Sequence, residues 1–247
     1  MPWALDLDGV VWLDEDPIPG SAEAVARLRD AGEDVLFCTN LSLRPVREVE
    51  EKLSCHGIPA EGAVLTSAMA AATLVEPGER VLLCAGAGAA EALRERGVEL
   101  VEDGAVDAVV VGLTLDFDYA ALRRASDAVR RGARLIGTND DPTFPTPAGL
   151  TPGGGAILAA VAVASGVEPV VAGKPYAPMA ELVRARLGDH GIVVGDRADT
   201  DGALAARLGY RFALVLSGST PWADGADPVP DLVAADLAAV VDQVLSK

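Results

Sequence analysis

Carboxylate side chains follow two apolar stretches of the chain. Asp6 and Asp8 come directly after the apolar residues 3–5, and Asp196 comes after the apolar stretch at 192–195. On an extended backbone Asp6 and Asp8 lie on the same face, because they are two residues apart. Carboxylates that gather in a partly dry site repel one another unless a cation lies among them. An all-oxygen set of ligands with open positions suits Mg²⁺, so this spacing indicates a magnesium site.

Two further apolar stretches end in residues that can hold a phosphoryl group. Thr39 and Asn40 follow residues 35–38, and Lys174 follows residues 170–173. In open parallel α/β sheets, ligands bind outside the carboxyl ends of the strands, so residues in these places are expected to converge. A hydroxyl and an ammonium supply a hydrogen-bond donor and a positive charge to phosphoryl oxygens. The combined set predicts chemistry on a phosphate ester.

Each of these residues also has a purely structural interpretation. The pair Asp6 and Asp8 is compatible with a turn or a helix cap, and Asp199 and Thr200 are compatible with capping of the helix that follows them. A single lysine such as Lys174 is most often a surface residue. The ordered set, and not any one member, favours the catalytic interpretation.

Short apolar stretches alternate with amphipathic stretches along the whole chain. This alternation predicts an α/β protein with a Rossmann-like, doubly wound parallel sheet that is covered on both faces. The predicted strands lie at residues 3–7, 35–38, 64–66, 81–84, 98–101, 108–112, 134–137, 170–172, 192–195 and 212–216. The predicted helices lie at 21–31 (capped by Ser21), 45–55, 67–75, 89–96, 119–131, 156–164, 177–187, 201–208 and 231–245. A polar loop rich in proline and glycine occupies residues 138–155.

The composition excludes several classes of protein. The 247 residues are 50% hydrophobic and 23% charged, which excludes a disordered or fibrous chain. The formal net charge of −17 disfavours binding to nucleic acid and to an anionic membrane surface. The sequence shows neither an apolar run of about 18 residues nor a signal-peptide pattern, so we expect a cytoplasmic protein without a membrane span. The three cysteines lack metal-ligand spacing and are expected to be reduced thiols.

The polar motifs, in their order along the chain, resemble those of the haloacid dehalogenase superfamily. The resemblance is strongest to its type IIA phosphatases, the group of phosphoglycolate, glycerol phosphate and pyridoxal phosphatases. Residues 6–10 (DLDGV) resemble the first motif, Thr39-Asn40 the second, residues 173–175 (GKP) the third and residues 195–201 (GDRADTD) the fourth. The long insertion between the second and third motifs resembles the large α/β cap of the C2 subclass. The family usually has a further asparagine where Leu41 stands here, which implies a change in the hydrogen bonding of that loop.

The resemblance implies a two-step mechanism. Asp6 would be the nucleophile that forms an aspartyl-phosphate. Asp8 would protonate the leaving oxygen and then, as a carboxylate, activate the hydrolytic water. Dehalogenases of the superfamily lack an acidic residue at the position of Asp8, so phosphate ester chemistry is favoured over cleavage of a carbon–halogen bond.

The resemblance also implies how the cofactor and the phosphoryl group are held. Mg²⁺ would be bound by the Asp6 side chain, the Asp8 backbone carbonyl and Asp196, with Asp201 behind these ligands. Thr39, the backbone of Asn40 and Lys174 would hold the transferring phosphoryl group.

Two domains follow from the same resemblance: a catalytic core of residues 1–67 and 173–247, and a cap of residues 68–172. The cap loop at 138–155 offers Asn139 and Asp141 to a substrate but contains no arginine or lysine. A second anionic group on the substrate would lack a partner there, which makes glycerol 3-phosphate the favoured small phosphorylated metabolite. Phosphoglycolate, a nucleoside monophosphate, pyridoxal phosphate and an aryl phosphate are the alternatives. Relatives often dimerise through the cap, so a homodimer is a further implication.

Three other functions fit the sequence less well. Gly86 and Gly88 lie between a predicted strand and a predicted helix, as in a dinucleotide-binding domain, but Glu91 occupies the third glycine position. A phospho-acceptor signalling domain uses a similar aspartate pocket but is much shorter and lacks the insertion. A non-catalytic scaffold that kept the fold would not need the four residues Asp6, Asp8, Lys174 and Asp196 together.

Overall fold

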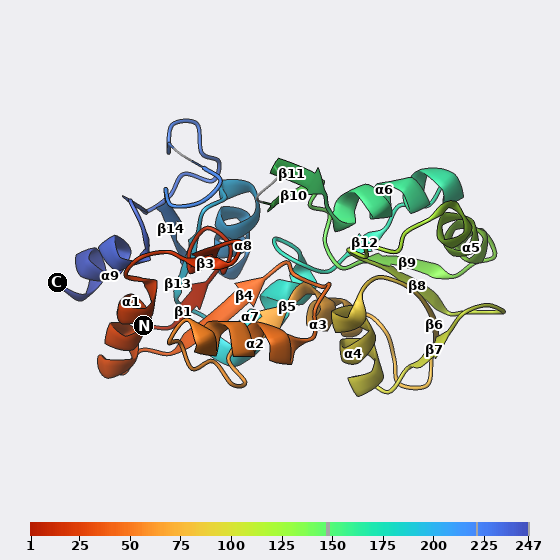
Figure 1. Ribbon diagram of the computed structural model, residues 1–247, viewed down its shortest axis with the longest axis horizontal. Coiled ribbons are helices and arrows are strands. Elements are labelled where there is room, and N and C mark those ends of the chain that lie inside the picture. Colours follow the sequence, from red (N-terminus) through yellow and green to blue (C-terminus); the bar gives the residue numbers. More distant parts are fainter. Residues whose placement is uncertain (147–148, 221, 247) are drawn as a thin grey trace. The chain divides into compact units, whose positions relative to one another are not determined.

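The computed structural model describes residues 1–146, 149–220 and 222–246, and the chain divides into two compact units (Figure 1). The first unit consists of Met1–Thr39, Arg47–Leu65 and Lys174–Lys247, and the second of Asn40–Val46 and Thr66–Gly173. The chain therefore passes from one unit to the other four times, at 39/40, 46/47, 65/66 and 173/174.

The first unit is built on a six-stranded sheet with the strand order β15-β14-β13-β1-β4-β5. Strand β1 is central and pairs in parallel with β13 on one side and β4 on the other. Its three residues are fully buried, as expected for an apolar strand in a covered parallel sheet. The strands are β1 (Trp3–Leu5), β4 (Val35–Thr39), β5 (Val64–Thr66), β13 (Ile192–Gly195), β14 (Arg211–Val215) and β15 (Leu232–Ala234).

Two pairs of helices pack against this sheet. Helix α1 contacts α9, and α7 contacts α8, and each of the four helices also contacts strands of the sheet. The apolar faces of these helices are thereby removed from water. The helices are α1 (Ser21–Asp30), α2 (Val46–Cys55), α7 (Ala177–Leu187), α8 (Ala203–Leu208) and α9 (Leu237–Leu245). A short antiparallel hairpin, β2 (Trp12–Leu13) with β3 (Asp16–Pro17), follows β1.

The second unit contains a five-stranded parallel sheet with the strand order β12-β9-β8-β6-β7. The strands are β6 (Arg80–Cys84), β7 (Glu99–Val101), β8 (Ala108–Val111), β9 (Arg134–Gly137) and β12 (Val170–Val171). The helices are α3 (Ser67–Ala72), α4 (Ala87–Glu95), α5 (Tyr119–Arg130) and α6 (Gly154–Ser165). A separate antiparallel hairpin joins β10 (Thr143–Thr146) and β11 (Gly149–Pro152).

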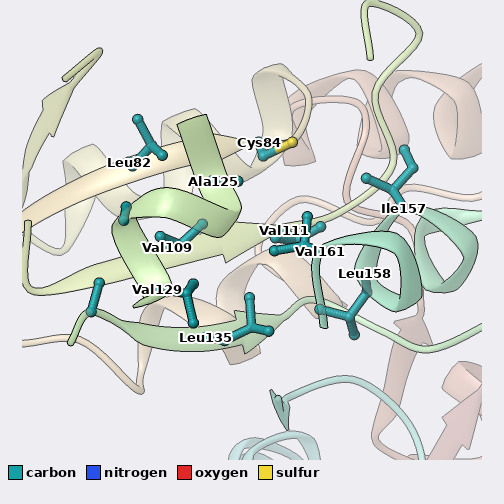
Figure 2. Packing of buried hydrophobic residues seen from close by; sticks show 12 residues of the cluster. Leu82, Cys84, Val109, Val111, Ala125, Val129, Leu135, Ile157, Leu158 and Val161 are labelled. Atoms are coloured by element: carbon teal, nitrogen blue, oxygen red, sulfur yellow. The ribbon is translucent and has the colours of Figure 1, made fainter. Parts of the chain in front are cut away.

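One face of this second sheet packs against α5 and α6. Figure 2 shows Val109 and Leu135 of the sheet beside Val129 of α5 and Leu158 of α6, all of them buried. Burying an aliphatic side chain of this size stabilises the fold by about 1.5–3 kcal/mol. A methyl group at Gly137 would overlap Leu158, so the absence of a side chain there allows α6 to approach β9 closely.

The predicted α/β class with a parallel sheet is confirmed, but the end of the chain differs from expectation. Residues 232–234 form strand β15, whereas the sequence pattern predicted one helix over 231–245. Helix α9 begins only at Leu237, where the Asp236 carboxylate accepts a hydrogen bond from the Ala239 N–H. This cap sets the start of the helix and leaves the residues before it free to pair with β14.

Three local predictions are also corrected. Gly20, and not Ser21, stands before the first helix, and the Ser21 hydroxyl donates to the Val11 carbonyl instead. The predicted helix at 201–208 begins at Ala203, after a π-helical turn η1 (Ala198–Gly202), and no side-chain cap precedes it. The loop predicted at 138–155 contains the β10–β11 hairpin.

In the part of the chain that the structure describes, no helix is both long and apolar enough to cross a bilayer.

Candidate active site

Three adjacent strands of the first unit deliver polar residues to one edge of its sheet. Asp6 follows β1, Thr39 is the last residue of β4, and Asp196 follows β13. Because β4, β1 and β13 are parallel neighbours, their carboxyl ends lie at the same edge. The strand order also reverses direction around β1, and such a reversal opens a crevice for ligands at the carboxyl ends.

Three carboxylates of the first unit form a cluster at this edge. One oxygen from each of Asp6, Asp196 and Asp201 lies within 4.8 Å of the others. Asp196 and Asp201 are buried, and the Asp6 side chain is 11% exposed. Carboxylate oxygens are the ligands that hard divalent cations such as Mg²⁺ prefer. The donor set therefore fits a divalent metal ion, as predicted from the spacing of these residues in the sequence.

Lys174 lies between two members of this cluster. Its Nζ is 2.7 Å from Oδ1 of Asp6 and 2.7 Å from Oδ1 of Asp201. The lysine side chain is only 3% exposed, and a buried ammonium is stable only when anionic partners surround it. Asp201 accepts a second hydrogen bond at Oδ2 from the Arg197 backbone N–H, which fixes the orientation of that carboxylate.

The pKa values in the cluster reflect both burial and neighbouring charges. Burial raises the pKa of Asp6 to about 6 and that of Asp201 to about 7, and Lys174 opposes both shifts. Burial also disfavours the Lys174 ammonium, but Asp201 and Asp6 outweigh this effect and hold its pKa well above the usual range. Burial and the neighbouring Asp201 raise the pKa of Asp196. A bound divalent cation would favour the ionised form of all three carboxylates.

A loop after β14, which the sequence pattern did not single out, supports Asp196. The Ser219 backbone N–H donates to Asp196 Oδ2 at 2.5 Å. A Cβ atom on Gly218 would lie 2.6 Å from the Asp196 Cγ, and one on Gly9 would lie equally close to it. Gly9 also has φ +82°, which favours glycine. These two glycines allow two loops to close around one carboxylate, and a serine-rich turn after a strand was too weak a signal to predict this contact.

Asp8 lies beside Asp6 in the sequence but outside the carboxylate cluster. The indole Nε1 of Trp12 donates to Asp8 Oδ1 at 3.0 Å. Asp8 itself is exposed to solvent. Partial desolvation by the surrounding chain still raises the pKa of its carboxyl, and the hydrogen bond from Trp12 opposes that rise.

The remaining predicted site residues lie in the second unit and contact one another. The Asn40 side-chain amide donates to Asp141 Oδ2 at 2.8 Å, and the Asn139 amide donates to the Asn40 carbonyl at 2.7 Å. The Asp141 backbone N–H donates to Asn139 Oδ1 at 3.2 Å. Asn139 is only 4% exposed. Asn139 and Asp141 therefore both contact Asn40, the residue that follows Thr39. These contacts join positions 99 and 101 residues apart, and no local sequence pattern predicts them.

Comparison with known proteins identifies the family. Residues 3–99 match the model of the haloacid dehalogenase-like hydrolases, and residues 171–240 match a second model of the same hydrolase type. The chain belongs to this family, as its motifs predicted.

Several relatives resemble the chain over most of its length. An acid sugar phosphatase of Staphylococcus saprophyticus is 37% identical over 81% of this chain and 80% of the relative. A D-glycerol 3-phosphate phosphatase of Mycobacterium tuberculosis is 39% identical over 94% of this chain and 69% of the relative. The solved structure of a glycerol phosphate phosphatase from M. tuberculosis in complex with magnesium has a TM-score of 0.89 and 36% identity, and covers 97% of this chain and 75% of that one. The predicted enzyme class, a phosphoric monoester hydrolase that acts on small phosphorylated metabolites, is confirmed.

Proposed function

We propose that this protein hydrolyses a small organic phosphate monoester through an aspartyl-phosphate on Asp6. The observation that carries the proposal is the position of the Asp6 carboxylate, at the carboxyl end of the central strand, 2.7 Å from the Lys174 ammonium and within the carboxylate cluster. A carboxylate held beside a fixed positive charge is placed to attack an anionic phosphoryl group whose charge that ammonium offsets.

In the first step an Asp6 oxygen forms a bond to phosphorus while the bond from phosphorus to the ester oxygen breaks. Asp8 gives its proton to the departing oxygen, which leaves as an alcohol. In the second step water attacks the same phosphorus, Asp8 takes the proton of that water, and the bond between Asp6 and phosphorus breaks. Inorganic phosphate leaves, and both aspartates return to their starting forms.

Mg²⁺ is the cofactor that the donor set supports best. Asp6 and Asp196 would bind it together with the Asp8 backbone carbonyl, and Asp201 would hold Lys174 beside them. When bound, the ion would neutralise charge on the phosphoryl oxygens. The M. tuberculosis relative whose structure contains magnesium supports this assignment. Thr39, buried at the end of β4, is proposed to donate to a phosphoryl oxygen together with the Asn40 backbone N–H.

For the substrate we propose glycerol 3-phosphate. The segment at 138–155 of the second unit carries no arginine or lysine, which disfavours a leaving group with a second anionic charge. The D-glycerol 3-phosphate phosphatase among the relatives supports the same choice. We assign the second unit the role of a cap that selects the substrate. A homodimer formed through that unit and a cytoplasmic location remain predictions from the sequence, and size-exclusion chromatography with light scattering tests the first.

The test is phosphate release from a panel of esters with and without Mg²⁺. The panel contains glycerol 3-phosphate, phosphoglycolate, a nucleoside monophosphate, pyridoxal phosphate and p-nitrophenyl phosphate. We expect Mg²⁺-dependent release that is lost in Asp6→Asn and retained in Asp30→Asn, a matched change at an exposed helix end. Hydroxylamine trapping followed by mass spectrometry should place a hydroxamate on Asp6. A folded protein that releases no phosphate from any ester would contradict the proposal and favour a scaffold role.

A further inference from the structure

The chain makes a tight turn directly after Asp8, and this turn places Trp12 beside it. The Leu7 carbonyl accepts backbone hydrogen bonds from Val10, Val11 and Trp12, at 3.2, 2.8 and 3.2 Å. The Gly9 N–H donates back to the Trp12 carbonyl at 2.8 Å. These bonds close the turn and restrict the position of the Trp12 backbone relative to Asp8.

The Trp12 side chain is in turn held from two sides. It is only 3% exposed, and the Lys52 ammonium lies 4.4 Å from the centre of its ring. The His56 ring lies 6.0 Å away, measured between ring centres. Lys52 is anchored by the Asp14 carbonyl and lies 3.6 Å from Glu15. The indole is therefore a fixed group, and its N–H reaches Asp8 Oδ1 at 3.0 Å.

The chemistry of this hydrogen bond distinguishes the two oxygens of Asp8. An indole N–H can only donate, so Oδ1 must accept. When Asp8 carries a proton, the carbonyl oxygen of the acid is the stronger acceptor, so the bond to Trp12 keeps the proton on Oδ2. Because Asp8 as a whole is exposed, its carboxyl remains accessible to a substrate.

We propose that Trp12 is a positioning residue for the proposed phosphatase reaction: its indole N–H fixes Asp8 so that Oδ2 delivers the proton to the leaving oxygen. The inference rests on the proposed function, and within it Trp12 acts only through Asp8. It predicts a defect that depends on how much protonation the leaving group needs, which a packing role for Trp12 would not produce.

The experiment compares two esters of nearly equal size, p-nitrophenyl phosphate and p-nitrobenzyl phosphate. The first releases a stabilised phenolate, which needs little help from an acid, and the second releases an alkoxide, which must be protonated. The quantity measured is kcat/KM, because it reports the steps up to formation of the phospho-enzyme and excludes the later hydrolysis. We expect Trp12→Phe to lower kcat/KM about ten-fold or more on the benzyl ester and no more than about two-fold on the phenyl ester.

Two further forms of the protein keep the test decisive. Incorporating β-(3-benzothienyl)alanine at position 12 replaces the N–H by sulfur without changing the ring shape, and it should reproduce the Trp12→Phe defect even where that variant folds poorly. Incorporating 5-fluorotryptophan at the same position keeps the N–H and should restore the wild-type ratio between the two esters. Trp222→Phe, at a residue that is 66% exposed, is the matched control and should leave the ratio unchanged.

The outcomes separate this inference from the function on which it rests. If the variants without the N–H lose activity equally on both esters, or lose none, Trp12 is only a packing residue and the inference fails while the phosphatase assignment stands. If the wild-type protein releases phosphate neither from these two esters nor from any ester of the panel described above, the proposed function fails, and the role of Trp12 fails with it.

Discussion

Lys174 and Asp201 form an ion pair in which almost no part of either side chain reaches solvent. The Nζ–Oδ1 distance is 2.7 Å, and the exposed fractions of the two side chains are 3% and 1%. Such a pair adds little stability by itself, because the desolvation of both ions offsets their attraction. Its value lies in the fixed position of the ammonium beside Asp6, and removing one partner leaves a buried charge without compensation.

We therefore expect Lys174→Met to abolish measurable turnover and to lower the free energy of unfolding by about 3–5 kcal/mol. Urea denaturation in the presence of EDTA measures the second effect without interference from metal binding. The double variant Lys174→Met/Asp201→Leu should regain part of that stability without regaining activity, because an apolar pair replaces the ionic one. Equal stability of the single and double variants would contradict the argument.

The three clustered carboxylates predict that Mg²⁺ stabilises the folded protein. A ligand that binds only the native state adds about 2.7 kcal/mol at one hundred times its dissociation constant. The midpoint temperature of thermal unfolding should be higher with Mg²⁺ than with EDTA, and Asp196→Asn should remove most of this difference. Asp199→Asn is the matched control: the Asp199 side chain is 68% exposed and pairs with Arg197, so this variant should keep the shift. A shift of the same size in Asp196→Asn would place the ion elsewhere.

The close approach of Gly218 to Asp196 predicts a defect in activity with little loss of folding. A methyl group at position 218 would lie 2.6 Å from the Asp196 Cγ and must displace that carboxylate. Gly218→Ala should therefore raise the Mg²⁺ concentration needed for half-maximal activity. Gly209→Ala provides the contrast, since Gly209 has φ +74° and no neighbour within 4 Å of an added Cβ. It should cost about 1–2 kcal/mol of stability and leave the Mg²⁺ dependence unchanged.

The alternation of apolar and amphipathic segments was sufficient to predict most of the fold. Strands β9 and β13 and helix α7 occur where the pattern placed them, because glycine or proline marks their limits. The hairpin β2–β3 has only two residues in each strand, too few to produce a periodic signal. Strand β15 was missed because its pairing with β14, and not its own pattern, makes it a strand.

The candidate site was predicted to a similar extent. The spacing of the aspartates in the sequence predicted that Asp6 and Asp196 converge, because each follows one of two parallel neighbours in the same sheet. The same reasoning was wrong for Lys174, because β12, the strand before it, belongs to the sheet of the second unit. The contacts of Trp12 with Asp8 and of Asn139 with Asn40 were not predicted, because each depends on the path of a loop and not on the residue types that flank a strand. The assignment of Asn139 and Asp141 to substrate binding remains a prediction.

The contact between Asn139 and the Asn40 carbonyl predicts a general, substrate-independent effect. The Asn40 carbonyl also accepts a hydrogen bond from the Ser67 hydroxyl at 2.7 Å, so losing the Asn139 donor removes one hydrogen bond without leaving the carbonyl unpaired. Asn139→Ala should therefore lower the free energy of unfolding by about 0.5–1.5 kcal/mol. The variant should also lower kcat/KM to the same extent on every ester in the panel, because Asn40 and Thr39 are proposed to hold the phosphoryl group that all the esters share. An effect confined to one substrate would instead support direct contact of Asn139 with the leaving group.

The three cysteines should differ sharply in reactivity. Burial raises the pKa of Cys38 to about 12 and that of Cys84 to about 11, whereas Cys55 is exposed. At about pH 8, Cys38 and Cys84 therefore remain protonated thiols, and the thiolate is the form that reacts. Iodoacetamide should label Cys55 alone in the native protein and all three cysteines in urea, as read by peptide mass spectrometry. Rapid labelling of Cys38 in the native state would show that the end of β4 opens readily.

The order in which the two units can be completed follows from the four passages of the chain between them. All residues of the second unit, which ends at Gly173, leave the ribosome before the segment that begins at Lys174. Until that segment emerges, strand β1 has no β13 beside it and the ammonium of Lys174 is absent from the carboxylate of Asp6. The second unit can therefore be fully formed while the first still exposes an unpaired strand edge. A chain halted at Gly173 would contain every residue of the second unit but only Asp6 of the three clustered carboxylates.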